Sequence, residues 1–177
     1  MKKIILFLQL IFSIGMSAQT TVESVQVADM DEGAPICGKS IDLHKRILQA
    51  YNCDSTLIVF ACDTTKKGKN TDTGYLYSLD ANTLEVQWQK SLKLSLSKLY
   101  GVCSKGVLLS STLKSTGKSL LTLSDIKTGR SLWTQYLYPV YFNDSLDIVI
   151  GLEKVGGSKT YAYRLSTGEL LWDAEIP

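Results

Sequence analysis

Few residues of this chain have the types and spacings that carry out chemistry. His44 is the only histidine, and nothing near it resembles a known nucleophile motif, so serine–histidine or cysteine–histidine catalysis would depend on this one residue. A surface or packing histidine is expected instead. Asp29, Asp31 and Glu32 could contact a cation, but their position in a segment with Gly and Pro indicates a solvated loop. We therefore predict no catalytic residue, no cofactor-binding residue and no metal site.

The cysteines form no pattern typical of zinc binding or dithiol redox chemistry. None of their spacings is C-x-x-C, and a single histidine would leave zinc with an unusual ligand set. In an exported chain disulfides become possible, and four cysteines allow three full pairings. We expect free or singly paired buried cysteines, and the pairing stays open among Cys37, Cys53, Cys62 and Cys103.

The first eighteen residues have the order of a secretory signal peptide. A basic start at residues 1–3 precedes an apolar stretch at residues 4–16, and the small residues Ser17 and Ala18 follow. The apolar stretch is short for a membrane span; the alternatives are an anchor helix or a buried first strand. We predict cleavage near Ala18, export to the periplasm or the extracellular space, and no stable membrane anchor in the mature chain.

The charge of the mature chain favours no polyanionic partner. Removal of residues 1–18 takes away two lysines and no acidic residue, so the net charge falls from +2 to 0. A neutral chain has no general electrostatic attraction to nucleic acid or to an anionic membrane. The basic run at residues 66–69 lies between two expected strands and is predicted to form a solvated hairpin tip.

Three copies of one short pattern, each ending in tryptophan, predict the architecture. The pattern occurs at residues 79–88, 124–133 and 163–172. In each copy a threonine lies five residues before the tryptophan, and the tryptophans are 45 and 39 residues apart. Self-similarity at a period near 40 is typical of repeat proteins, whose units bury their apolar faces by stacking on a neighbour. We expect each tryptophan to hold one unit against the next, with a partner for its indole N–H.

The copies differ at two positions of the turn. Copies two and three have glycine after the threonine, but copy one has Leu84, so its turn should be strained or differently shaped. Asp80 of copy one and Asp125 of copy two can close the turn, but copy three has Arg164 at this position, so this closure should be missing there.

Short strands separated by turns fill the chain around these copies. Each copy follows apolar, β-branched runs of strand length, which makes about four strands per unit of about 40 residues, as in a propeller blade. We expect an irregular N-terminal segment over residues 19–46 and repeats over residues 47–177. The expected blades cover residues 47–92, 98–137 and 139–177.

The copies resemble the pyrroloquinoline-quinone-like β-propeller repeat, whose hallmark is leucine, aspartate, two variable residues, threonine, glycine, three variable residues and tryptophan. Residues 125–133 fit the hallmark throughout, residues 80–88 fit except at Leu84, and residues 167–172 fit its second half. The resemblance implies an all-β fold, a partial β-propeller of about three to four four-stranded blades.

The resemblance also bears on function. Quinoprotein dehydrogenases of this family close eight blades around a quinone and a calcium ion and tend to carry adjacent cysteines, whereas other members have lost the cofactor and serve as binding scaffolds. This chain has no adjacent cysteines, and 159 mature residues provide fewer than four blades. We expect an exported, non-catalytic, cofactor-free scaffold that binds protein. The alternatives are a fragment of a quinone-dependent oxidoreductase and a truncated propeller without independent activity.

An open fan of blades leaves two blade faces exposed, which invites association with a protein partner or with another copy. Two chains could close one ring, a partner could cap the faces, or the sequence could be the front part of a longer reading frame. The absence of an atypical capping unit after the third copy favours the last explanation.

Aromatic residues gather between the second and third units, at Tyr136, Tyr138, Tyr141 and Phe142. Rings in such positions either form a binding surface or pack one blade against the next. We expect them to pack in the core.

Overall fold

The computed structural model of the chain describes residues 22–28, 36–65 and 67–175. The expected signal peptide, the acidic residues Asp29, Asp31 and Glu32, and Lys66 lie outside these residues. The described part forms fourteen β-strands and no helix. It therefore confirms the all-β class.

Twelve of the strands form three four-stranded antiparallel sheets. The first contains β3 (Arg46–Cys53), β4 (Thr56–Thr64), β5 (Asn70–Asp80) and β6 (Val86–Lys93). The second contains β7 (Ser97–Cys103), β8 (Gly106–Thr112), β9 (Ser119–Ser124) and β10 (Ser131–Tyr136). The third contains β11 (Tyr138–Asn143), β12 (Ile148–Leu152), β13 (Lys159–Arg164) and β14 (Leu170–Glu175).

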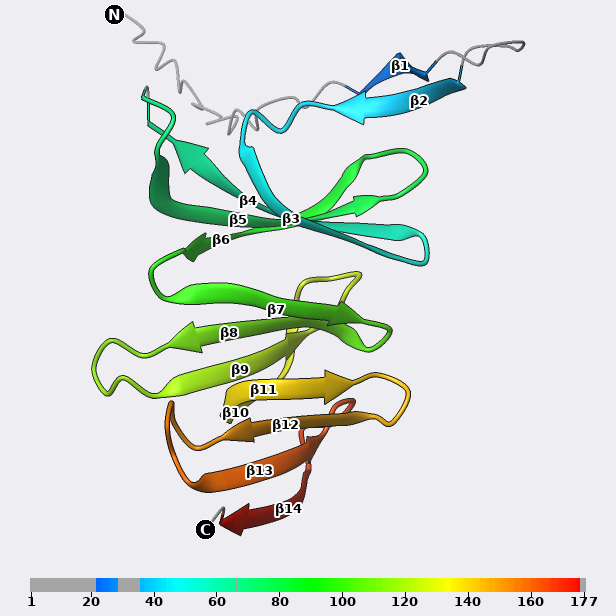
Figure 1. The fold of residues 1–177 in the computed structure, drawn as a ribbon. Helices are drawn as coiled ribbons and strands as arrows, with labels where there is room; N and C mark the ends of the chain where they lie inside the picture. Colours follow the sequence, from blue (N-terminus) through cyan, green and yellow to red (C-terminus); the bar gives the residue numbers. More distant parts are fainter. Residues whose placement is uncertain (1–21, 29–35, 66, 176–177) are drawn as a thin grey trace, which may run out of the picture.

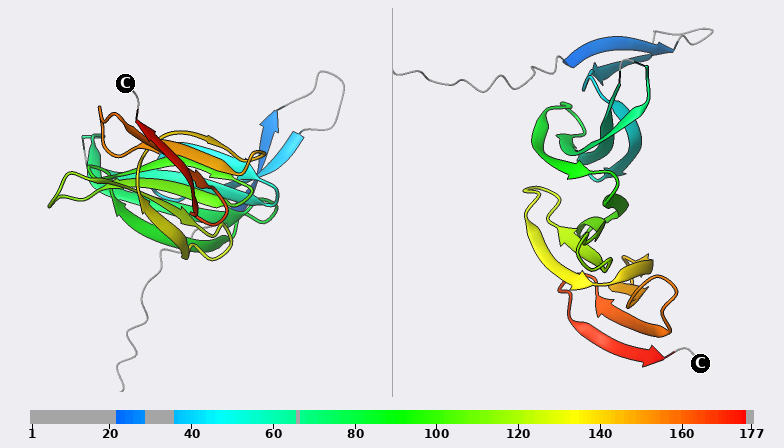
Figure 2. Two further views of the ribbon diagram at one scale, coloured as in Figure 1. Left: turned by 90° about the horizontal axis from the view of Figure 1, so that it is seen from below. Right: turned by 90° about the vertical axis from the view of Figure 1, so that its left-hand side faces the viewer.

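In each sheet the strands follow one another in chain order, and the sheets lie one after another along the molecule (Figure 1). The first and third sheets occupy opposite ends, so the described residues form an open stack and no closed ring (Figures 1 and 2). This is the arrangement of a partial β-propeller with three blades, here called blades 1, 2 and 3.

The three blades also repeat two β-bulges at equivalent places. One lies in the first strand, where Leu48, Tyr100 and Val140 are the extra residues. The other lies immediately before the tryptophan, at Gln87, Leu132 and Leu171. A bulge bends and twists its strand, so the same two bulges impose one blade shape on three different sequences.

The N-terminal segment differs from expectation. Instead of irregular chain, it contains a hairpin in which β1 (Val22–Ala28) pairs with β2 (Ile36–Ile41), with Val22 opposite Ile41. Gly33 and Pro35, which indicated a break, stand between these strands in the sequence. The two strands satisfy each other's backbone groups, so the segment needs no place in a blade to be regular.

Three apolar clusters lie at successive interfaces along the stack. The first joins the segment after β2 to blade 1 and contains Leu43, Val59, Ala61, Tyr77 and Leu79. The second joins blades 1 and 2 and contains Ile58, Phe60, Leu76, Leu99, Val107 and Leu109. The third joins blades 2 and 3 and contains Cys103, Leu108, Leu121, Leu123, Trp133, Leu137, Val149 and Leu165. Burial of apolar surface between blades therefore holds the stack together.

The basic run forms the expected tip of the β4–β5 hairpin. Lys67 and Lys69 are exposed, and the N–H of Gly68 donates to the carbonyl of Thr65 at 2.8 Å. Gly68 has φ of 73°, the left-handed conformation that glycine adopts without strain.

Candidate interaction surface

His44 lies on the surface. Its side chain is exposed, its Nδ1 lies 2.9 Å from Oδ2 of Asp42, and its backbone N–H donates to Oδ1 of the same residue at 2.7 Å. The Asp42 carboxylate therefore closes a local turn around the histidine. The described residues place no nucleophile in this arrangement.

The cysteines with described side chains are free thiols. Cys62 and Cys103 are buried and Cys53 is half-buried, while Cys37 lies in β2 with its side chain outside the description. Burial raises the pKa of the Cys53 and Cys103 thiols, and Cys103 Sγ contacts the carbonyl of Gly106 at 3.3 Å. Protonated, buried thiols are poor nucleophiles.

The described residues gather no cluster of the side chains that usually ligate metals. Calcium takes six to eight oxygen ligands, mostly from clustered carboxylates and carbonyls. No group of three or more histidine, cysteine, aspartate or glutamate side chains is arranged to hold a metal in the described ranges.

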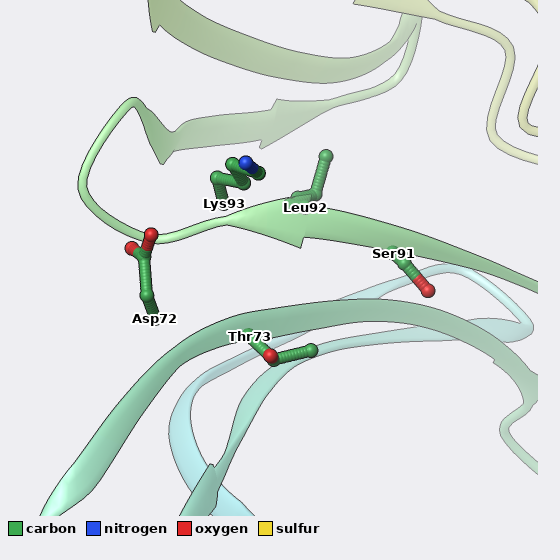
Figure 3. A pocket seen from close by; sticks show the side chains of 5 residues that line it. All are labelled: Asp72, Thr73, Ser91, Leu92 and Lys93. Atoms are coloured by element: carbon green, nitrogen blue, oxygen red, sulfur yellow. The ribbon is translucent and has the colours of Figure 1, made fainter.

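A shallow pocket of about 360 Å³ lies between the start of β5 and the end of β6. Asp72 and Thr73 line it from β5, and Ser91, Leu92 and Lys93 line it from β6 (Figure 3). The Asp72 carboxylate already accepts bonds from the N–H and hydroxyl of Ser95, at 2.6 and 3.0 Å, and these bonds lower its pKa. The one carboxylate of the pocket is thus engaged in shaping the β6–β7 connection.

A polar network flanks the first apolar cluster on blade 1. Lys45 Nζ lies 2.6 Å from Oδ1 of Asp63, and the Tyr75 hydroxyl donates to Oδ2 at 2.8 Å. The hydrogen bonds from Lys45 and Tyr75 lower the pKa of Asp63, and the bond to Asp63 raises the pKa of Lys45. Each partner stabilises the ionised form of the other, which is the behaviour of a structural ion pair.

Trp88 joins blade 1 to blade 2. Its Nε1 donates to the carbonyl of Ile126 at 2.9 Å, and its ring covers the turn that contains Gly129. Gly129 has φ of 68°, and a Cβ built on it would lie 2.9 Å from Cδ2 of Trp88. Both the backbone conformation and the ring therefore require glycine at this position.

Trp133 repeats this contact between blades 2 and 3. Its Nε1 donates to the carbonyl of Leu165 at 2.8 Å, and a Cβ on Gly168 would lie 2.7 Å from its Cγ. Gln135 Nε2 adds a bond of 2.8 Å to the Gly168 carbonyl. The expected role of the tryptophans as contacts between successive units is confirmed for Trp88 and Trp133.

Trp172 occupies the same position in blade 3, but no blade follows it in the described chain. It pairs with Ala162 as Trp133 pairs with Leu123, yet it is 44% exposed where Trp133 is 9% exposed. Strand β14 lies at the free end of the stack (Figure 1). The contact that Trp88 and Trp133 make with a following blade has no counterpart at Trp172 in the described residues.

Residues near Trp172 occupy positions that correspond, by strand register, to residues of blade 2 that lie at its interface with blade 3. Ile150 pairs with Ala162 as Leu108 pairs with Leu123, and Leu108 is fully buried whereas Ile150 is half-buried. The bulge residue Val140 is 57% exposed, although its counterpart Tyr100 packs against Phe142 of the next blade. We name Val140, Ile150 and Trp172 the open face.

The turn of the first copy keeps the shape of the others. Leu84 has φ of 61° and its N–H donates to the Asp80 carbonyl at 2.8 Å, as Gly129 donates to Asp125 at 2.9 Å. The turn is therefore strained and not reshaped, which is the first of the two outcomes predicted. Leucine is tolerated because no tryptophan of a preceding blade covers this turn.

The third copy closes its turn with a carboxylate from outside the copy, that of Asp147. Asp147 Oδ1 accepts the N–H of Ser166 at 2.8 Å and its Oδ2 accepts the Ser166 hydroxyl at 2.6 Å. In copies one and two the equivalent N–H groups donate to Asp80 and Asp125 within the turn. The missing local closure at Arg164 is confirmed, and a tertiary contact replaces it.

The aromatic cluster divides between surface and core. Phe142 packs on Gly101, where a Cβ would lie 2.6 Å from its ring. Tyr136, Tyr138 and Tyr141 are 60%, 38% and 48% exposed, so the expectation of core packing is wrong for them. They lie on β10 and β11, whose outer positions face solvent at the edges of their sheets.

Comparisons with solved structures find partial likenesses to three proteins. Europium-containing methanol dehydrogenase shares 15% identity over 72% of this chain and 31% of its own, with a TM-score of 0.45. The β-propeller domain of the Trilobed protease from Pyrococcus furiosus, described as having an open velcro topology, shares 7% identity over 76% and 44%, with a TM-score of 0.49. BamB from Moraxella catarrhalis shares 15% identity over 77% and 51%, with a TM-score of 0.37.

These likenesses concern the fold alone, and the chain spans only about a third to a half of the length of those structures. No protein-family model matches the sequence, and no curated protein matches it. Within the described residues, no helix has the length and apolar character needed to cross a membrane.

Proposed function

We propose that this chain is an exported, non-catalytic β-propeller repeat protein of the pyrroloquinoline-quinone-like type that serves as a protein-binding scaffold through its open face. The observation that carries the proposal is the exposure of Trp172, 44% against 9% for its counterpart Trp133. Large aromatic side chains that are exposed beside other apolar residues are the anchors of protein interfaces.

The geometry favours binding over chemistry. The one histidine is held on the surface by Asp42, and the pocket carboxylate Asp72 accepts hydrogen bonds from Ser95. Burial raises the pKa of the half-buried Cys53 thiol and of the buried Cys103 thiol. Within the described residues, the histidine is paired with Asp42 and not with a serine or cysteine nucleophile.

The test is retention of proteins from the native extract by the tagged full chain and by two variants. Val140→Asp places a charge on the open face, and Leu132→Asp places the same charge on a residue of blade 2 that is 52% exposed. Proteins that the native chain and the Leu132 variant retain, and the Val140 variant loses, support the scaffold. Retention that is the same for all three proteins contradicts it.

Two further measurements address the remaining alternatives. Addition of pyrroloquinoline quinone and calcium should produce no visible absorbance shift, whereas a saturable shift would support an oxidoreductase. N-terminal sequencing of the protein recovered after export should begin at Gln19, as expected for cleavage after Ala18. An intact N-terminus would contradict the processing.

A further inference from the structure

Blades 2 and 3 each use one face of their sheet to receive the blade before them. Leu109 of blade 2 belongs to the apolar cluster shared with blade 1, and Tyr161 of blade 3 packs on the cluster shared with blade 2. By strand register, Val59 is the counterpart of Leu109 on blade 1, and Tyr77 is the counterpart of Tyr161. Val59 and Tyr77 therefore mark a receiving face on blade 1.

A segment of the chain itself covers this receiving face. Residues 39–45, here called the hook, run from the end of β2 to the start of β3 beside blade 1 (Figure 1). Leu43 of the hook packs with Val59 and Tyr77. These two residues are 3% and 5% exposed, as little as Leu109, which is 5% exposed beneath blade 1. The hook therefore buries them as fully as a blade does.

Polar contacts hold the hook near both of its ends. Lys39 Nζ donates to the carbonyl of Asn82, on the turn between β5 and β6, at 2.9 Å. Lys45 Nζ lies 2.6 Å from Oδ1 of Asp63 and 4.6 Å from the centre of the Tyr75 ring. Because these contacts lie toward opposite ends of the β4–β5 hairpin, the hook crosses the face of blade 1.

The turn of blade 1 that corresponds to the covered glycine turns is also unsuited to a tryptophan. At Gly129 and Gly168, a built Cβ would lie 2.9 and 2.7 Å from the covering indole. Leu84 stands at the equivalent position with φ of 61°, so its Cβ takes up the space that the indole fills in the other two turns. A glycine there would relieve the strain of a left-handed leucine. The strained residue is thus a second obstacle to a blade at this end of the stack.

We infer that the hook and Leu84 make blade 1 a closed end, which keeps it from receiving a propeller blade of another copy or of the same chain. β-Proteins cover exposed edges in this way, and repeat proteins end in capping units of different sequence. The inference goes beyond the proposed function, because it concerns the end of the stack opposite the open face. A ring formed by one chain or by two cannot close across blade 1 while the hook is in place.

The test opens blade 1 and then supplies a blade to it. The opened protein carries Ile41→Ser and Leu43→Ser, which remove the apolar contacts of the hook, and Val140→Asp, which disables its own open face. A second opened protein also carries Leu84→Gly. The matched control carries Val140→Asp alone. Sedimentation velocity of each protein, mixed with a trace of fluorescently labelled native chain, measures whether the open face of the native chain binds to blade 1.

Oxidation by hydroxyl radicals, quantified by peptide mass spectrometry, reports the state of the hook in the same samples. Tyr77 should become severalfold more reactive in the opened proteins, while Tyr163, which packs between blades 2 and 3, should be unchanged. Lys45→Ala is a milder variant that removes only the link to Asp63, and it should also raise Tyr77 oxidation. Tyr77 that stays protected in the opened proteins and in Lys45→Ala would overturn the role of the hook.

We expect the control to leave the labelled native chain unbound and the opened protein to bind it. Leu84→Gly should strengthen this binding by about tenfold, the effect of removing one overpacked contact. Equal binding by the control and the opened proteins, or binding by none of them, overturns the closed end. Equal affinity with and without Leu84→Gly would overturn the part assigned to Leu84.

Discussion

The indole Nε1 of Trp133 donates a hydrogen bond of 2.8 Å to the carbonyl of Leu165, a residue of the next blade and 32 positions away in the chain. The same ring lies against Gly168, so one side chain makes both a polar and an apolar contact across the blade boundary. An aromatic ring with one polar atom is suited to this double role.

Trp133→Ala should lower the free energy of unfolding by about 3–5 kcal/mol, the usual cost of truncating a buried aromatic ring. Trp172→Ala should cost less than about 1 kcal/mol, because that ring is 44% exposed and covers no following blade. Urea unfolding of both variants measures the difference. A loss below about 1 kcal/mol for the Trp133 variant would refute its role between the blades.

Gly168→Ala should destabilise the protein by more than Gly117→Ala. Both glycines are left-handed, with φ of 71° and 67°, but only at Gly168 does a Cβ meet an indole, at 2.7 Å from Trp133 Cγ. Backbone strain should cost about 1–2 kcal/mol at either site, and overpacking adds about 1–3 kcal/mol at Gly168.

The comparison is made by thermal and urea unfolding of the two variants. In the background of Trp133→Ala, the additional cost at Gly168 should disappear, because the clashing ring is gone. Equal costs at Gly117 and Gly168 would contradict the contact.

Asp147→Ala should lower stability by about 1–3 kcal/mol, because it removes two charge-assisted hydrogen bonds from the Ser166 turn. Glu169→Ala is the control on the same turn. The Glu169 side chain makes an exposed ion pair with Arg164, at 3.5 Å, so its removal should change stability by less than about 0.5 kcal/mol. A neutral Asp147 variant would mean that the turn closes without the carboxylate.

Asp63→Asn should remove a pH-dependent part of the stability. Hydrogen bonds from Lys45 and Tyr75 lower the pKa of Asp63 in the folded state, so its contribution is present above the unfolded value, near 3.9, and is lost as the pH falls through the lower folded value. The difference in unfolding free energy between native protein and variant, about 1 kcal/mol or less, should be constant between about pH 5 and 9.

Below about pH 4 this difference should shrink toward zero. Lys45 changes in the opposite sense, because its raised pKa makes its contribution disappear only as the pH rises above the ordinary lysine value. Urea titrations at pH 7 and pH 3 measure the acid branch, and a difference that grows on acidification would show that Asp63 is not stabilised as an anion.

The thiols of Cys53 and Cys103 should react slowly with iodoacetamide at pH 8 in the folded protein, because burial raises the pKa of both. Cys103, which is 5% exposed, should be the slower of the two. Peptide mass spectrometry after timed alkylation measures each site, with denatured protein as the reference for full reactivity. Equal rates in folded and denatured protein would show that neither thiol is shielded.

Tertiary contacts explain where prediction from the sequence was incomplete. The strain at Leu84 could be predicted from the turn, but its tolerance depends on the absence of a covering tryptophan. Asp147 replaces the aspartate missing at Arg164 by accepting a bond from Ser166, 19 positions away in the chain, which no local pattern reveals. The exposure of Tyr136 and Tyr141 accompanies their places on β10 and β11, which are edge strands of their sheets.

The repeated pattern by itself determined the all-β class, the four-stranded units and the role of Trp88 and Trp133, because turn chemistry and strand periodicity are local properties that recur with each copy. Only the tertiary structure decided which glycine faces which tryptophan, that Ile41 and Leu43 pack against blade 1, and that Trp172 is 44% exposed. Those facts depend on the order and direction in which blades stack, since an interface exists only where a second surface is present to bury the first.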